Sequence, residues 1–213
     1  MAVRKIPKNY LSVTGSFASQ KNDQMDEFES LLEKEHLMLL EFDETVDRFE
    51  VQPVNIPVPG EPKGYTPDAL VHFLADPHTG EIRRTSLVEV KYTDDLERHA
   101  EKYKNKFALA TKFAEEHGWE FCIKTQHDIR TQRLKNIKFL REYRNIDVHE
   151  QDQQQLLLTA RTLGHTFSVQ AMLDQLVLSD DAQLHWLPII WRSILNRTLV
   201  ADWDRPLTYN TLL

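Results

Sequence analysis

Short stretches of alternating or continuous apolar residues predict strands in the first two thirds of the chain. They are separated by PGEPKG (residues 59–64) and DPHTG (residues 76–80), whose Pro and Gly favour turns. Longer stretches with apolar residues three and four positions apart predict helices. Their order, α-β-β-β-α-β-α, predicts a mixed α/β domain. The predicted strands are 46–58, 64–74, 81–92 and 119–125, and the predicted helices are 24–42, 94–118 and 127–144.

The last third of the chain has a different pattern. Apolar residues at helical spacing predict short helices at 152–164, 167–176 and 184–199, followed by an extended, turn-rich tail. Short helices followed by a hairpin-like tail are typical of winged-helix domains, whose helix–turn–helix units tolerate a Gly in the turn. The sequence therefore predicts an N-terminal arm at 1–23, an α/β domain at 24–147 and a winged-helix-like domain at 148–213.

Composition narrows the class of protein. Hydrophobic residues make up 41% of the chain and charged residues 28%, and no apolar run approaches the roughly 18 residues of a membrane span. The N-terminus lacks the apolar stretch of a secretory signal. Cys122 is the only cysteine, which excludes an internal disulfide framework and a cysteine-based zinc site. These features indicate a protein of the reducing cytoplasm.

The charge is unevenly distributed. A net charge of −7 disfavours strong nonspecific binding to nucleic acid, which depends on neutralising phosphates. Bases nevertheless outnumber acids between residues 124 and 147, which predicts a basic amphipathic helix. This helix either contacts a DNA backbone or forms a solvated face between two domains. The bases are Lys124, Arg130, Arg133, Lys135, Lys138, Arg141 and Arg144.

Acids and a lysine interrupt two of the predicted strands. Glu89 and Lys91 are two residues apart, so their side chains point to the same face of a strand. Asp68, on the preceding strand of the same predicted hairpin, faces them. Charges on a sheet face that helices cover are normally paired or bound to a metal, and carboxylates suit Mg²⁺ or Mn²⁺. Taken alone, the spacing also fits an ion pair on a solvent-facing strand.

The residues next to these acids carry a resemblance. Pro67-Asp68 followed by Glu89-Val90-Lys91 is similar to the PD-(D/E)xK nuclease motif, whose superfamily has a restriction-endonuclease-like core with this element order. A wider set of motifs resembles the TnsA family, the endonuclease subunit of heteromeric, Tn7-like transposases. The resemblance covers residues 24–213, including a tail similar to the family's winged-helix domain. The motifs are Ser30-x-x-Glu33, Leu40-Glu41-Phe42-Asp43, Gln52-Pro53, Tyr65-Thr66-Pro67-Asp68 and Glu89-x-Lys91.

The resemblance implies metal-dependent DNA cleavage by a defined set of residues. The catalytic positions would be Glu33, Asp68, Glu89 and Lys91. The three carboxylates and the backbone carbonyl of Val90 would hold Mg²⁺ or Mn²⁺, and Lys91 would position the attacking water. Some family members carry Gln where this chain has Glu89. Candidate DNA contacts are Gln52, Arg130, Arg133, Lys135 and Lys138.

The resemblance also implies partners. The chain would cut the 5′ ends of a transposon in the bacterial cytoplasm, while an RNase H-like, TnsB-like transposase cuts the 3′ ends and a TnsC-like AAA+ regulator selects the target. No membrane is involved. Two other functions fit the same residues: a stand-alone restriction- or repair-type nuclease, and a non-catalytic winged-helix adaptor with a decayed nuclease domain. The intact acid–acid–lysine set argues against decay. A winged helix binds DNA in some proteins and protein in others, so the partner of that domain stays open.

Overall fold

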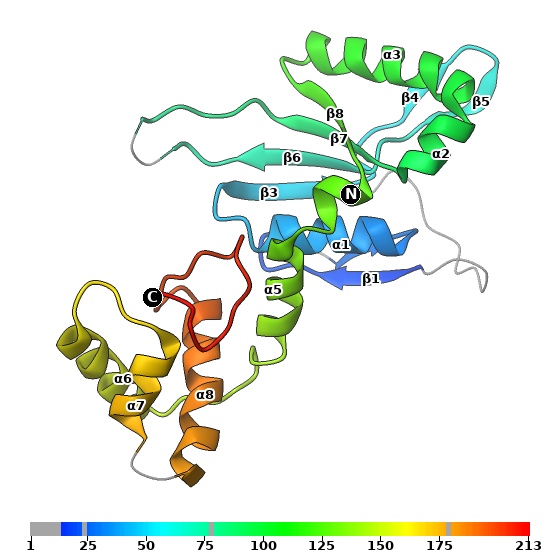
Figure 1. Ribbon diagram of the computed structural model, residues 1–213. Coiled ribbons are helices and arrows are strands. Elements are labelled where there is room, and N and C mark those ends of the chain that lie inside the picture. The colour runs from blue at the N-terminus through cyan, green and yellow to red at the C-terminus, as the bar shows by residue number, and fades with distance from the viewer. Residues whose placement is uncertain (1–13, 23–24, 77–78, 178–179) are drawn as a thin grey trace. The chain divides into compact units, whose positions relative to one another are not determined.

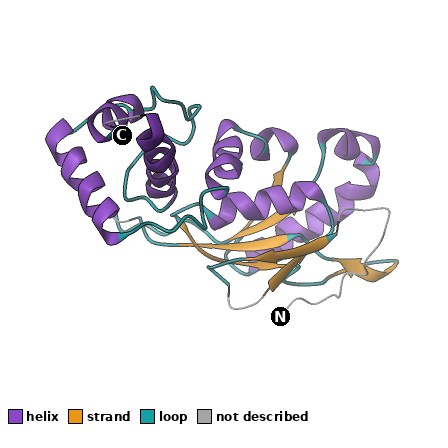
Figure 2. Cartoon of the chain, turned by 90° about the horizontal axis from the view of Figure 1, so that it is seen from below, coloured by secondary structure: helices purple, strands orange, loops and turns teal. Residues whose placement is uncertain are grey.

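The computed structural model describes residues 14–22, 25–76, 79–177 and 180–213. The chain divides into two compact units, Met1–Arg130 and Thr131–Leu213. Within the described ranges the named strands all belong to the first unit, and the second is built from helices and loops (Figure 2). No helix in these ranges combines the length and the apolar character needed to cross a bilayer.

A four-stranded mixed sheet forms the centre of the first unit (Figure 1). The strand order is β3-β6-β7-β8; β3, β6 and β7 pair antiparallel, and β8 joins β7 in parallel. Every residue of β7 is buried, as expected of a central strand covered on both faces. The predicted mixed α/β domain is therefore confirmed. The strands are β3 (Val46–Val51), β6 (Ala69–Phe73), β7 (Ser86–Val90) and β8 (Glu120–Lys124).

Helices cover both faces of this sheet. On one face, Leu70 and Leu87 pack against Ala110 and Ala114 of α3, which forms the crossover between the parallel strands β7 and β8. On the other face, α1 contacts β3 and β7 (Figure 1). A short helix, α4, follows β8 and contacts α1. The helices of this unit are α1 (Leu31–Glu41), α2 (Thr93–Arg98), α3 (Ala100–Glu116) and α4 (Gln126–Ile129).

Two small hairpins differ from the sequence expectation. Gly15–Ala18 (β1) pairs with Met25–Phe28 (β2), where the pattern predicted an arm and then a helix from residue 24; residues 1–13 of that arm lie outside the described residues. Ile56–Val58 (β4) pairs with Glu61–Tyr65 (β5), so most of the predicted PGEPKG turn is strand. Only Pro59 and Gly60 turn the chain, with Gly60 at φ +82°, a conformation that favours glycine.

Two predicted helices are interrupted. The helix predicted at 94–118 breaks at His99 into α2 and α3, and Gly118 terminates it with φ +73° as expected. The helix predicted at 127–144 breaks after α4. Thr125 and Asp128 form a capping box that starts α4, and Thr131 is the N-cap of the next helix, α5. Local caps therefore override a continuous helical pattern.

The second unit contains α5 and the predicted C-terminal helices. Helix α5 packs against α8, and α7 contacts both α6 and α8. The buried Asn136 of α5 donates hydrogen bonds to the carbonyls of Trp203 (2.8 Å) and Arg205 (2.6 Å). The units consequently divide before α5, whereas the sequence predicts a boundary after residue 147. The helices are α5 (Gln132–Arg141), α6 (Glu150–Leu163), α7 (Val169–Leu176) and α8 (Asp180–Leu195).

The tail after α8 runs back to the start of α7. Leu212 forms an isolated bridge with Ser168, and Phe167 and Leu213 exchange backbone hydrogen bonds. Within residues 196–213, which are all described, the bridge at Leu212 is the only β-type pairing. A two-stranded wing made by the tail itself is therefore not formed, and the winged-helix assignment stays a prediction.

We expect Asn136→Ala to destabilise the second unit. The substitution leaves the carbonyls of Trp203 and Arg205 without their donor, and a buried unsatisfied group typically costs roughly 1–3 kcal/mol. Urea unfolding followed by tryptophan fluorescence measures the loss. Gln155→Ala, at an exposed position of α6, is the matched control. Equal unfolding midpoints for the two variants would contradict the assigned role of Asn136.

Candidate active site

The acids and the lysine singled out in the sequence meet at one end of the central sheet. Asp68 directly precedes β6 and Lys91 directly follows β7, and the antiparallel pairing of Ala69 with Val88 brings these two strand ends together. The ammonium of Lys91 lies 2.7 Å from Oε1 of Glu89 and 3.5 Å from Oδ2 of Asp68. The structure thus places a cation between two carboxylates.

Neighbouring groups fix the orientation of each carboxylate. The Val90 amide donates a 2.7 Å hydrogen bond to Oδ2 of Asp68, and the Tyr65 hydroxyl donates one of 2.7 Å to Oε2 of Glu89. Lys91 also donates to the Val90 carbonyl at 3.1 Å, so this carbonyl faces the same cluster. Sequence reasoning gave Tyr65 no role of its own, although it stands three residues before Asp68 in the stretch that carries the resemblance.

Glu33 approaches the cluster from α1 but is engaged in capping that helix. Its backbone amide donates to the Ser30 hydroxyl, which in turn donates to Oε1 of Glu33, while Oε2 accepts from the Glu29 amide. Glu33 lines a small cavity together with Asp68 and Val90. Its volume is ≈ 10 Å³, about the space of one water molecule. Glu33 and Asp68 thus line one small cavity, close enough for the charge of Asp68 to act on the pKa of Glu33.

Burial dominates the electrostatics of these acids. Burial, together with the charge of Asp68, raises the pKa of Glu89 to about 8 and the pKa of Glu33 to about 7. Burial also raises the pKa of Asp68, despite the opposing effects of Lys91 and the Val90 amide. Burial alone would lower the pKa of Lys91, but the charges of Asp68 and Glu89 outweigh it and raise this pKa. One ammonium is shared by two carboxyl groups, so it does not fully offset the effect of burial on their pKa values.

Gln52 sits beside the cluster in an unusual backbone conformation. Its φ is +49°, a left-handed value that is uncommon for a residue other than glycine. Its amide donates to the Asp68 carbonyl at 3.0 Å, and its side chain donates to Glu29 at 3.1 Å. The side-chain oxygen is buried without a hydrogen-bond partner among the described residues. Backbone strain of this kind concentrates at functional sites. Here the strained residue donates the backbone hydrogen bond that holds Asp68 in place.

The cluster opens onto a cleft of ≈ 530 Å³. Asp68, Glu89 and Lys91 line it together with Gln52 and Tyr65, and β5 and α3 contribute its flanks. A water molecule takes up about 30 Å³ in the liquid, so the cleft has room for part of a nucleotide backbone. The buried acids are thus accessible from one side to a large substrate.

Two family models match this chain. The TnsA-like endonuclease N-terminal model matches residues 43–126, and the TnsA endonuclease C-terminal model matches residues 128–203. The chain belongs to the TnsA endonuclease family. The N-terminal match contains Asp68, Glu89 and Lys91, whereas Glu33 precedes it. No curated protein matches the chain.

Membership of the TnsA family makes this chain an endonuclease of the Tn7-like transposition class. It also accounts for the two units, since each family model falls almost entirely on one of them.

The basic residues predicted to contact DNA are distributed differently from the acids. In the first unit, Arg130 pairs with Glu35 at 2.8 Å and donates to the Tyr92 hydroxyl. In the second unit, Arg133 makes a two-point contact with Asp204 at 2.9 and 2.6 Å. These two arginines are committed to ion pairs within their own units, whereas the side chains of Lys135 and Lys138 in α5 are exposed.

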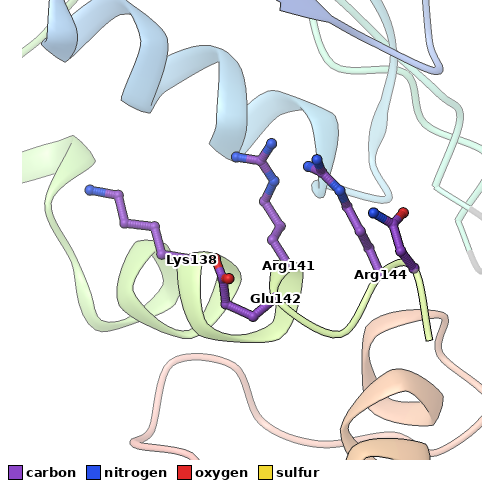
Figure 3. A pocket seen from close by; sticks show the side chains of 5 residues that line it. Lys138, Arg141, Glu142 and Arg144 are labelled. Atoms are coloured by element: carbon purple, nitrogen blue, oxygen red, sulfur yellow. The ribbon is translucent and has the colours of Figure 1, made fainter.

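Lys138 belongs to a basic surface at the end of α5. Lys138, Arg141 and Arg144 extend to the same side of the helix and the turn after it, with Glu142 between them (Figure 3). Cations at a helix C-terminus offset the negative end of the helix dipole. This position at the helix end explains the basic residues without a ligand.

The acid cluster has ligand atoms that suit a divalent cation, but they are not arranged to coordinate one. Carboxylate and carbonyl oxygens are the donors that Mg²⁺ and Mn²⁺ prefer. Burial, and after it the charge of Asp68, raises the pKa values of Glu33 and Glu89. In the described part of the chain, however, no three His, Cys, Asp or Glu side chains are close enough to hold a metal ion. Both oxygens of Glu89 are engaged, by Lys91 and Tyr65, so side chains must shift for a cation to bind.

The raised pKa of Glu89 predicts a pH-dependent stability of the metal-free protein. The folded state keeps the proton up to about pH 8, whereas the unfolded state loses it near pH 4.5. The resulting stabilisation is complete below the lower value and is lost as the pH rises through the higher one. We expect the thermal midpoint in EDTA to fall over this window, and to fall less steeply in Glu89→Gln. An unchanged slope in Glu89→Gln, matching the exposed control Glu97→Gln, would exclude Glu89 as the source.

Proposed function

We propose that this chain is a Mg²⁺- or Mn²⁺-dependent DNA endonuclease that cuts the 5′ ends of a transposon during cut-and-paste transposition. The observation that carries the proposal is the position of the Lys91 ammonium, between Glu89 and Asp68 and at the floor of an open cleft. This arrangement matches the acid–acid–lysine motif by which the sequence resembles PD-(D/E)xK nucleases.

The residues divide into holding and reacting groups. Asp68, Glu89, the Val90 carbonyl and Glu33 would hold the cation, which when bound polarises the scissile phosphate and activates a water as nucleophile. Lys91 orients that water and offsets the negative charge that develops on the phosphate. Tyr65 and the Val90 amide position Glu89 and Asp68, and Gln52 positions the backbone of Asp68.

The remaining parts of the proposal concern partners and place of action. The substrate is DNA at the transposon ends, the 3′ strands are cut by an RNase H-like, TnsB-like transposase, and a TnsC-like AAA+ regulator selects the target. The second unit, which we propose to be winged-helix-like, supplies a surface for DNA or for one of these proteins. Action on bacterial DNA places the chain in the cytoplasm.

Asp68→Asn should abolish cleavage and leave the fold intact. The two side chains have the same shape, but the amide lacks the charge on which a hard divalent cation depends. Cleavage of a transposon-end duplex in Mg²⁺ or Mn²⁺, with the partner transposase present, is the assay, and the thermal midpoint checks folding. Asp94→Asn, an exposed position of α2, is the control. Full 5′-strand cleavage by Asp68→Asn would refute the site.

Lys91→Ala should slow the chemical step far more than it weakens binding to DNA. Loss of one donor that acts on the transition state typically costs roughly 2.7–4 kcal/mol, about a hundred- to a thousandfold in rate. Single-turnover cleavage and DNA affinity in Ca²⁺ separate the two effects. A variant that loses affinity but keeps its single-turnover rate would make Lys91 a phosphate anchor and not a catalytic residue.

The chain alone should cut DNA poorly and depend on its transposase partner. With a net charge of −7, it is repelled by a polyanion, and nonspecific affinity comes almost wholly from phosphate neutralisation. A partner bound at the transposon end raises the local concentration of DNA. The measurement is 5′-strand cleavage of linear DNA bearing one transposon end, in Mg²⁺ at physiological salt, with and without the partner. Efficient, position-specific cleavage by the chain alone would favour the stand-alone nuclease.

A further inference from the structure

Three further lysines line the cleft together with the acid cluster. Lys63 lies on β5, and Lys102 and Lys106 lie on α3. Residues four apart in a helix share a face, so Lys102 and Lys106 both face the cleft. The sequence pattern did not single out these positions, because α3 also carries acids and its charges nearly balance.

The three lysines differ in how they are engaged. Lys106 is mostly buried and pairs with Glu61 of β5 at 2.7 Å, which ties the two flanks together. Lys63 is exposed, and Lys102 is exposed with its ammonium 5.9 Å from the Tyr103 ring. Within the described part of the chain, no acid forms an ion pair with either of them. Lys63 and Lys102 are thus available to an anion in the cleft.

The hairpin that carries Lys63 is held in a fixed shape. Asn55 donates hydrogen bonds to the carbonyl of Lys63 and to the Thr66 hydroxyl, both at 2.9 Å. Gly64 adopts φ +63°, and a Cβ at this position would come within 2.4 Å of the Asn55 side chain and 2.7 Å of the Ile56 carbonyl. The backbone around Lys63 is therefore packed closely enough to permit only glycine at residue 64, and the hairpin presents Lys63 from a rigid support.

We infer that the cleft lined by β5, α3 and the acid cluster binds the sugar-phosphate backbone of duplex DNA, with Lys63 and Lys102 contacting phosphates next to the one at the acid cluster. The inference rests on the proposed function and assigns the DNA-binding surface of that site. Of the residues predicted to contact DNA, Gln52 lines this cleft, whereas Arg130 and Arg133 form ion pairs and do not line it.

The charges explain why the backbone binds here in an acidic protein. The chain as a whole is acidic, but in the cleft lining four lysines balance four acids: Lys63, Lys91, Lys102 and Lys106 against Glu29, Glu61, Asp68 and Glu89. Lys106 pairs with Glu61, and Lys91 is shared by Asp68 and Glu89, so Lys63 and Lys102 are the lysines left to contact phosphates. Because both lysines would contact phosphates and not bases, the contact would be independent of DNA sequence.

The test is the salt dependence of DNA binding by the full chain. The probe is a fluorescein-labelled DNA duplex of random sequence, titrated by anisotropy in Ca²⁺ at several NaCl concentrations starting from low ionic strength. Each phosphate contact contributes roughly 0.9 to the slope of log K against log salt concentration. We expect Lys63→Gln and Lys102→Gln each to reduce the slope by about that amount, and the double variant by about twice as much.

Lys104→Gln is the matched control, because Lys104 is an exposed lysine of the same helix that does not line the cleft. It should leave the slope unchanged. The inference is overturned if Lys104→Gln acts as strongly as Lys102→Gln, if the double variant keeps the parent slope, or if the parent chain shows no binding at low salt.

The outcome is separable from that of the proposed function, because the binding assay involves no cleavage. A lysine-dependent slope in a chain that never cuts DNA would uphold the cleft and refute the nuclease. Metal-dependent cleavage by the parent chain, together with an unaltered slope in the double variant, would support the nuclease and refute DNA binding by these lysines.

Discussion

The site depends on keeping several carboxylates close together and largely out of water. Each buried acid favours its neutral form, and two acids side by side favour it further. The ammonium of Lys91, shared between Glu89 and Asp68, makes the cluster compatible with folding. The raised pKa values of Glu89 and Glu33 show that it does so incompletely. Because carboxylates must be deprotonated to bind a metal ion, the proposed cation would compete with the protons that burial keeps on these acids.

The sheet register places these groups within reach of one another. Pairing of Ala69 with Val88 sets the start of β6 against the end of β7, and a slip of one residue would turn Glu89 to the opposite face. The register is secured by the buried strand β7 and by the hydrogen bond from the Val90 amide to Asp68. The strand that carries the chemistry is thus the strand most tightly held by packing on both faces.

The sequence was sufficient to predict the elements that are determined by neighbouring residues in the chain. The central strands follow from apolar runs, and the meeting of Asp68 with Glu89 and Lys91 follows from alternation along adjacent strands. It was insufficient where the pairing partner decides the structure: the sequence predicts EPKG as part of a turn, but it becomes most of β5 by pairing with β4. Helix α5 joins the second unit through Asn136, whose partners lie near residue 204. Neither the capping contacts of Glu33 nor the left-handed backbone of Gln52 has a signal in hydrophobic patterning.

The left-handed conformation of Gln52 has a consequence for efforts to engineer this enzyme. A residue other than glycine at such a position costs of order 1–3 kcal/mol, and glycine would remove much of that strain. Glycine would also remove the amide side chain that holds Glu29. Relief of the backbone strain would stabilise the glycine variant, whereas loss of this hydrogen bond would destabilise it. The Asp68 carbonyl would keep its donor in either case, because that donor is the backbone amide of residue 52. Libraries built for robustness can therefore vary this side chain without removing the backbone contact to Asp68.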